Sequence, residues 1–124
     1  MPKRVLIIED NPDAADALAM LLRSAGHEVT TALNGVAGLE AARDFRPELV
    51  LCDIWLAGDL DGLAVVRQLR SEPGTQDATI IALSGISDPG DQATALGAGF
   101  DQFLLKPADP DRILEIAASP RSSA

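Results

Sequence analysis

The chain has 124 residues, of which 47% are apolar, so it fits one folded domain with a single core and leaves no room for a second. Acidic residues outnumber basic ones by 19 to 10, and the net charge of -9 argues against nucleic acid or an anionic membrane surface as a partner. With one cysteine, Cys52, and one histidine, His27, an internal disulfide and a Cys/His metal cage are excluded. The apolar run Val5 to Ile8 is too short for a signal-peptide core or a membrane span, so we expect a cytoplasmic protein.

Short runs of branched apolar residues alternate along the chain with segments of helical periodicity. This alternation is typical of repeated strand-helix units around a buried parallel sheet. The sequence predicts five strands, at Arg4 to Glu9, Glu28 to Ala32, Glu48 to Asp53, Thr79 to Ser84 and Gln102 to Leu105. A helix is predicted after each strand. In chain order, the helices run from Pro12 to before Gly26, from Gly35 to before Pro47, around Leu63 to Leu69 and before Pro73, after Asp88, and from Pro110.

Three of the predicted helices begin with a capping side chain followed by proline, at Asn11-Pro12, Asp88-Pro89 and Asp109-Pro110. The fourth helix is the weakest, because its apolar stripe contains only Ala93 and Leu96. The first helix has a broader apolar stripe that should face inward, formed by Ala14, Leu18, Leu21, Leu22 and Ala25.

Polar and ionisable side chains stand where several of the predicted strands end. Glu9 and Asp10 end the first strand, and Asp53 ends the third. Ser84 ends the fourth strand, and Lys106 directly follows the fifth. In an open parallel sheet, ligands bind at the carboxyl ends of the strands, beside the point where the strand order reverses. We therefore expect these side chains to lie at one edge of the sheet and to form the site.

Three carboxylates at one edge need compensating positive charge. Two carboxylates about 4 Å apart repel by roughly 4 kcal/mol at an effective dielectric constant of about 20. Lys106 can neutralise one charge, and Mg²⁺ suits the rest because it prefers carboxylate oxygens and keeps positions open for water and phosphate. A metal ion, an ammonium and a hydroxyl around a carboxylate can stabilise charge on phosphoryl oxygens, so these residues point to phosphoryl transfer.

Four motifs, in this order, carry a resemblance to a known family. They are VLIIEDN at Val5 to Asn11, LVLCDI at Leu49 to Ile54, ALSG at Ala82 to Gly85 and FLLKP at Phe103 to Pro107. From Lys3 to about Ala118 the chain resembles the receiver domain of two-component response regulators, of the CheY-like superfamily. The resemblance implies a flavodoxin-like α/β fold, a doubly wound parallel sheet of five strands in the order 2-1-3-4-5. The domain would span residues 1–118 and a flexible tail residues 119–124.

The resemblance also implies a role for each acidic residue. Asp53 would be the phosphoacceptor and would take a phosphoryl group from a phosphohistidine. Asp10 and Asp53 would ligate Mg²⁺ directly, and Glu9 would act through a water molecule. The backbone carbonyl of Trp55 would supply a further metal ligand.

The remaining site residues would act on the phosphoryl group and on the conformation. Lys106 and Ser84 would each bind a phosphoryl oxygen, so they join Asp53 as the catalytic set. Ser84 and Phe103 would form a switch, in which Phe103 rotates into the space that Ser84 leaves. The peptide bond between Lys106 and Pro107 would be cis.

Taken together, the resemblance implies a signalling domain that catalyses only its own phosphorylation and dephosphorylation, so we do not expect an enzyme. Mg²⁺ is the expected cofactor. The expected phosphodonor is a histidine kinase or a histidine phosphotransfer protein. The output would pass to a downstream protein or to a domain absent from this chain, and a homodimer could form through the fourth helix, fifth strand and fifth helix.

The loop after the third strand departs from the family pattern. Ala57 stands where many receivers have a proline, and about one extra residue precedes Asp61-Gly62, so the loop should be longer. Trp55 and Ile86 each stand two positions after a site residue. We hypothesise that the bulk of these two side chains shields the aspartyl phosphate from water and slows its hydrolysis.

Other functions stay open at this point. A receiver-like module that binds proteins without being phosphorylated would keep the fold, but every phosphorylation residue is retained here. A Mg²⁺-dependent phosphohydrolase with an aspartate nucleophile usually has a second aspartate two residues later as general acid, and Trp55 occupies that position. Flavin or nucleotide binding is disfavoured, because no glycine-rich loop follows the first strand and Glu9 and Asp10 would repel a phosphate.

Overall fold

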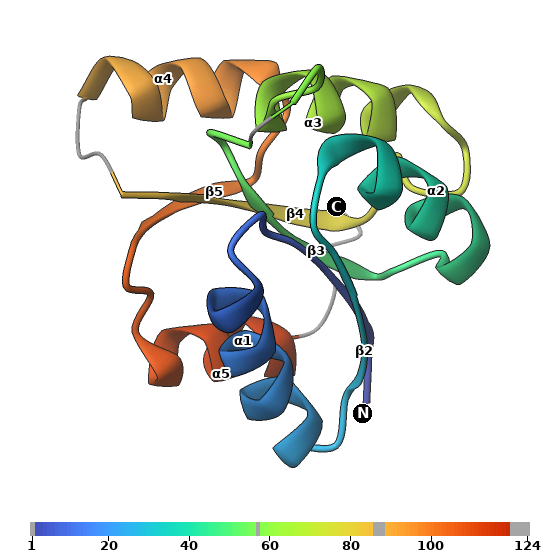
Figure 1. The fold of residues 1–124 in the computed structure, drawn as a ribbon, viewed down its shortest axis with the longest axis vertical. Helices are drawn as coiled ribbons and strands as arrows, with labels where there is room; N and C mark the ends of the chain where they lie inside the picture. Colours follow the sequence, from blue (N-terminus) through green and yellow to red (C-terminus); the bar gives the residue numbers. More distant parts are fainter. Residues whose placement is uncertain (1, 57, 86–88, 120–124) are drawn as a thin grey trace.

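A five-stranded sheet lies between two layers of helices (Figure 1). The computed structural model describes residues 2–56, 58–85 and 89–119. The elements in chain order are β1 Arg4–Ile8, α1 Pro12–Ser24, β2 Glu28–Ala32, α2 Gly35–Phe45, β3 Leu49–Asp53, α3 Gly62–Ser71, β4 Thr79–Ser84, α4 Pro89–Ala98, β5 Gln102–Leu105 and α5 Pro110–Ala118. All neighbouring strands are parallel, in the order β2-β1-β3-β4-β5. The predicted fold class and strand order are therefore confirmed.

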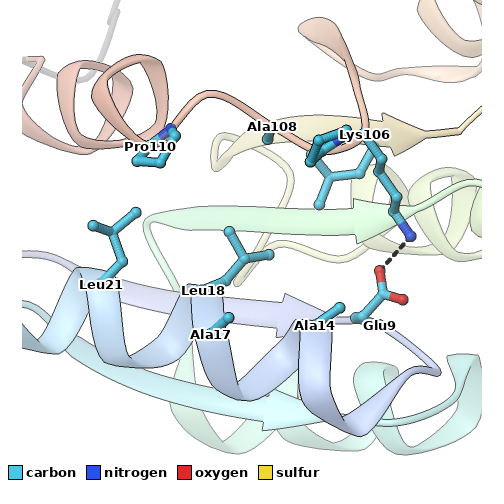
Figure 2. Close-up of a pocket in the computed structure, with 10 residues that line it drawn as sticks. Glu9, Ala14, Ala17, Leu18, Leu21, Lys106, Ala108 and Pro110 are labelled. Carbon is cyan, nitrogen blue, oxygen red and sulfur yellow. Dashed lines mark hydrogen bonds and ion pairs between the residues drawn. The ribbon is translucent and has the colours of Figure 1, made fainter.

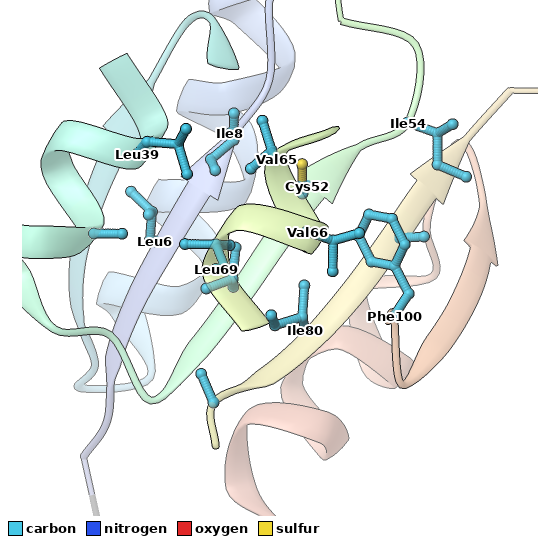
Figure 3. Packing of buried hydrophobic residues seen from close by; sticks show 14 of the residues in the cluster. Leu6, Ile8, Leu39, Cys52, Ile54, Val65, Val66, Leu69, Ile80 and Phe100 are labelled. Atoms are coloured by element: carbon cyan, nitrogen blue, oxygen red, sulfur yellow. The ribbon is translucent and has the colours of Figure 1, made fainter. Parts of the chain in front are cut away.

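Each face of the sheet has its own core, instead of the single core expected from the length of the chain, because successive residues of a strand point to opposite faces. Val5 and Ile7 pack against α1 and α5, whereas Leu6 and Ile8 pack against α2 and α3. Figure 3 shows the second core, in which Leu6, Ile8 and Cys52 of the sheet meet side chains of these helices. Burial of both faces fixes the strand register, since a slip by one residue would exchange the two sets of side chains. The residues that follow β1 and β3 are therefore held at a defined edge.

Two strand ends differ by one residue from the prediction. β1 ends at Ile8 instead of Glu9, and β3 begins at Leu49 instead of Glu48. Both glutamates still extend the ladder: the Glu9 N–H donates to the carbonyl of Ala32 at 3.0 Å, and the Glu48 N–H donates to that of Arg4 at 2.9 Å.

Polar side chains cap the helix starts. Asn11 Oδ1 accepts hydrogen bonds from two N–H groups in the first turn of α1, at 2.9 and 3.2 Å. Asp109 Oδ1 accepts one from α5 at 3.0 Å, so both of these predicted caps are confirmed. Asp61 caps α3 in the same way, at 2.9 Å. Asp88 lies outside the described residues.

The apolar face predicted for α4 is wrong. Ala95 is fully buried, whereas Ala93 and Leu96 are exposed, Leu96 by 44%. Ala95 and Ala98 have the same helical spacing as Ala93 and Leu96, so spacing alone does not decide which pair faces the sheet. Phe100, in the turn after α4, packs into the same core as Ala95 and selects that face.

The last helix of the chain is α5, which follows β5. The Ser119 N–H donates to the carbonyl of Glu115 at 3.1 Å and closes the last turn of the helix. Residues 120–124 of the predicted tail lie outside the described residues. Among the described residues, no helix is long and apolar enough to cross a membrane.

Candidate metal centre

Three carboxylates meet at the carboxyl edge of the sheet. Glu9 and Asp10 follow β1, and Asp53 is the last residue of β3. β1 and β3 are neighbours, with Ile8 paired to Cys52, so the residues at their ends emerge side by side. One carboxylate oxygen of each acidic residue lies within 4.8 Å of the other two. The structure therefore brings the three predicted acidic residues together.

The ammonium group of Lys106 bridges two of these carboxylates. Its Nζ lies 2.6 Å from Glu9 Oε2 and 2.9 Å from Asp53 Oδ2, and Figure 2 shows the contact with Glu9. Only 1% of Glu9 and 6% of Asp53 are exposed. Burial alone would lower the pKa of Lys106, but the hydrogen bonds to Glu9 and Asp53 and their charges outweigh it and raise the pKa above its usual value. Lys106 is therefore held as a cation.

Backbone N–H groups hold the other oxygens of the two buried carboxylates. The N–H of Asn11 donates to Glu9 Oε1 at 3.2 Å, and the N–H of Trp55 donates to Asp53 Oδ1 at 3.1 Å. Each carboxylate thus has one oxygen on Lys106 and the other on a backbone N–H, which fixes its orientation. Trp55 as a whole is 48% exposed.

The charge balance of the cluster fits a divalent cation. Glu9, Asp10 and Asp53 carry three negative charges, and Lys106 compensates one of them. Asp10 is only half-buried, so solvent reaches the cluster on its side. Carboxylate oxygens at an open edge suit Mg²⁺, which keeps several of its water ligands. The donor set therefore fits the predicted magnesium ion.

Ser84 lies at the same edge of the sheet, whereas Phe103 lies farther back. Ser84 is fully buried, and its carbonyl accepts a hydrogen bond from the Lys106 N–H at 2.8 Å. Phe103 pairs with Ala82 in the β4–β5 ladder, and its partly buried ring packs against the core of Figure 3. The peptide bond between Lys106 and Pro107 is cis, as the resemblance implies.

An apolar groove opens beside the Glu9–Lys106 pair. It has a volume of about 570 Å³ and runs between α1 and the segment 106–110 after β5 (Figure 2). Beyond the ion pair, the lining is aliphatic and comes from three parts of the fold. These lining residues are Ala14, Ala17, Leu18 and Leu21 of α1, Leu83 of β4, and Pro107, Ala108 and Pro110.

The groove explains why the apolar stripe predicted for α1 is only partly correct. Ala14, Leu18 and Leu21 are only partly buried, because they line the groove. The buried residues of α1 are Leu22 and two alanines outside the predicted stripe, Ala15 and Ala19. Ala25 is exposed, because the helix ends at Ser24 and Ala25 no longer follows the helical period. The sequence predicts no groove here, because the other wall of the groove comes from the segment after β5.

The family model of the response regulator receiver domain matches residues 5–118. The chain belongs to this family. The receiver domain is 33% identical over 114 residues to the DNA-binding response regulator MtrA of Mycolicibacterium smegmatis, which covers 92% of this chain and 48% of MtrA. It is 31% identical to the polar-differentiation response regulator DivK of Brucella anthropi, over 96% of both chains.

A solved structure with a metal ion is also similar to this receiver domain. It is the receiver domain of the sensor histidine kinase PA1611 of Pseudomonas aeruginosa, with a magnesium ion coordinated in its active site cleft. The two superimpose with a TM-score of 0.84 at 30% identity, over 94% of this chain and 95% of the other. In this family, the cluster of Glu9, Asp10 and Asp53 fits the magnesium and phosphoaspartate site.

The similar proteins use the receiver domain in different settings. This chain spans about half the length of MtrA and nearly all of DivK, and in PA1611 the domain belongs to a kinase. Family membership establishes a receiver domain of two-component response regulators, and such domains serve signalling.

Proposed function

We propose that this receiver domain accepts a phosphoryl group on Asp53 in the presence of Mg²⁺ and signals through a change of conformation. The observation that carries the proposal is the contact of Lys106 with both Glu9 and Asp53, at 2.6 and 2.9 Å, inside the acidic cluster. An ammonium fixed beside Asp53 is ready to stabilise the charge of a phosphoryl group on that side chain.

The transfer joins phosphorus to a side-chain oxygen of Asp53. That oxygen attacks the phosphorus of a phosphohistidine, the P–N bond breaks, and the imidazole leaves with a proton taken from solvent. Mg²⁺, held by Asp10 and Asp53, by Glu9 through water and by the Trp55 carbonyl, would neutralise charge on the phosphoryl oxygens. Lys106 donates to one of these oxygens. Water then hydrolyses the aspartyl phosphate, so the domain turns over no substrate other than its own phosphoryl group.

The proposed switch consists of Ser84 and Phe103. The Ser84 hydroxyl donates to a phosphoryl oxygen, and Phe103 turns inward as Ser84 moves, which alters the surface around α4 and β5. Leu96 of α4 and Leu105 of β5 are 44% and 47% exposed, so an apolar contact is available there. A downstream protein, or a second copy of this chain, is the proposed partner of this surface.

The proposed phosphodonor is a histidine kinase or a histidine phosphotransfer protein in the cytoplasm. A donor must bring its phosphohistidine to the edge of the sheet that carries Asp53. The apolar groove along α1 ends at Lys106, beside that edge, and matches the apolar face of an amphipathic helix. We therefore expect the donor to lay such a helix into the groove.

Mass spectrometry after incubation with acetyl phosphate and Mg²⁺ tests the proposal. We expect one phosphoryl adduct on the wild-type domain, no adduct without Mg²⁺ and none on Asp53→Ala. Asp59→Ala is the matched control, because Asp59 is an exposed acid of the following loop and should leave the adduct unchanged. An unmodified wild-type domain would favour the alternative, a module that binds proteins without phosphorylation.

A further inference from the structure

Two glycines pack against the loop between β3 and α3. Gly62 is the first residue of α3, and a methyl group there would lie 2.3 Å from the carbonyl oxygen of Asp53 and 2.6 Å from the Cα of Ile54. Gly35 is the first residue of α2, and a methyl group there would lie 2.7 Å from the Cβ of Leu60 and 2.8 Å from its carbonyl oxygen. Such distances are too short for real contacts, and most of the atoms involved are backbone. Both helices therefore approach the loop only because these residues lack a side chain.

Hydrogen bonds close the loop at the same place. The Gly62 N–H donates to the carbonyl of Ile54 at 2.8 Å, and the Ile54 N–H donates to the carbonyl of Leu83 in β4 at 3.0 Å. The side chains of Ile54 and Leu56 are buried in the core. The two ends of the loop are therefore tied to each other and to the sheet.

Trp55, which directly follows Ile54 in this loop, contacts the metal centre. Trp55 donates its backbone N–H to Asp53 Oδ1 at 3.1 Å, and Asp53 belongs to the acidic cluster. A methyl group at Gly62 would push on the carbonyl of Asp53 itself. A binding site has to hold its groups within about 0.5 Å, so a shift of this peptide would reach the site directly.

We propose that Gly62 and Gly35 are positioning residues of the magnesium site: they let α3 and α2 close the loop and keep the Trp55 backbone against Asp53. This inference rests on the proposed function, because it assumes that Mg²⁺ binds at Asp53. It assigns the affinity of the site partly to two residues that offer no ligand atom.

Titration with MgCl₂, followed by tryptophan fluorescence, measures the effect. Trp55 is the only tryptophan in the sequence, so the emission reports on this loop. We expect Gly62→Ala to weaken Mg²⁺ binding about 10-fold or more, as loss of a supporting contact around a metal does elsewhere. Gly35→Ala should weaken it in the same direction but less, since it pushes on Leu60 at the far end of the loop. Gly38→Ala is the matched control, because a methyl group there would meet the Ile8 side chain at 2.6 Å in the core and not the loop.

The unfolding free energy, measured in urea for each variant, separates positioning from general stability. The control should lose stability and keep its Mg²⁺ affinity. The proposal is overturned if folded Gly62→Ala binds Mg²⁺ as tightly as the wild type, or if Gly38→Ala loses as much affinity as Gly62→Ala. Should Gly62→Ala fail to fold, Gly35→Ala decides by the same criterion. A wild-type domain that binds no Mg²⁺ overturns the proposed function as well, whereas unchanged affinity in the variants overturns the positioning role alone.

Discussion

Lys106 and Glu9 lie 97 positions apart in the sequence, and their side chains meet at 2.6 Å. β1 and β5, which carry them to this edge, are not neighbours, because β3 and β4 lie between them in the sheet. Asp53, at the end of β3, contacts the same ammonium at 2.9 Å. A single cation therefore ties together residues that follow or end three strands.

Replacement of Lys106 by methionine should destabilise the domain. Lys106→Met leaves Glu9 and Asp53 buried without their cation, and loss of a buried partner typically costs about 3–5 kcal/mol. Because 30% of the lysine side chain is exposed, we expect a smaller loss of about 1–3 kcal/mol in the unfolding free energy. Mg²⁺ should restore part of it, because the metal supplies positive charge at the same carboxylates. Urea unfolding with and without Mg²⁺ measures both effects.

Arg43→Met is the control for this variant. Arg43 also donates to a carboxylate, that of Glu72 at 3.0 Å, but the pair lies on the surface. Its loss should change stability little and should not depend on Mg²⁺. If Lys106→Met were as stable as the wild type without Mg²⁺, the bridge would have no structural role.

The acidic cluster can be predicted from the sequence for a topological reason. Parallel strands that are neighbours in the sheet end at one edge, so Glu9, Asp10 and Asp53 must meet once the strand order is known. The order itself rests on the family motifs. Lys106 is predicted near the cluster, but its contact with two carboxylates instead of one depends on the path of the chain after β5.

Other features depend on loop paths and on close packing, which periodicity does not encode. The contact of the Trp55 N–H with Asp53 follows from the course of the β3–α3 loop. The buried face of α4 is decided by Phe100 in the next turn, outside the helix. The groove exists because α1 is flanked by the segment after β5, and no residue of α1 alone reveals this neighbour.

A charge placed in the groove should slow phosphotransfer from a protein donor. Ala17 lines the groove and is exposed, so Ala17→Glu should fold normally. We expect phosphotransfer from a histidine kinase that phosphorylates the wild type to slow by about tenfold or more, equivalent to about 1.4 kcal/mol of lost docking. Phosphorylation by acetyl phosphate should be unchanged, because a small donor needs no groove.

Met20→Glu provides the matched control for the groove. Met20 is 70% exposed on the same helix, and it does not line the groove. The Met20→Glu variant should leave phosphotransfer from the kinase unchanged. Equal slowing by both variants would indicate a general charge effect and argue against docking in the groove.

Removal of the Trp55 indole should shorten the lifetime of the phosphorylated form. The Trp55 backbone contacts Asp53, so its side chain begins next to the acceptor. If the indole restricts the approach of water, Trp55→Asn should hydrolyse its aspartyl phosphate faster than the wild type, while Trp55→Phe should keep the slow rate. The decay of the phosphorylated form, followed by mass spectrometry, gives the rates. Ile86, the other half of the hypothesis, lies outside the described residues, and a rate unchanged in Trp55→Asn would remove the indole from it.

His27 should make the stability of the domain depend on pH. Its Nδ1 accepts a hydrogen bond from the Lys3 N–H at 3.0 Å, and burial, together with the charge of Lys3, lowers the pKa of the imidazole below 6.5. The unfolded chain then binds the proton more tightly than the folded one. The contribution of His27 to the unfolding free energy is therefore fully present above about pH 6.5, and it is lost as the pH falls through the lowered pKa of the folded state. Urea unfolding between about pH 5 and pH 8 should show this loss in the wild type and a smaller one in His27→Asn, whose amide oxygen can accept the same hydrogen bond without titrating. The difference between the two curves isolates His27 from the carboxylates, which titrate in both proteins, and parallel curves would contradict the assignment.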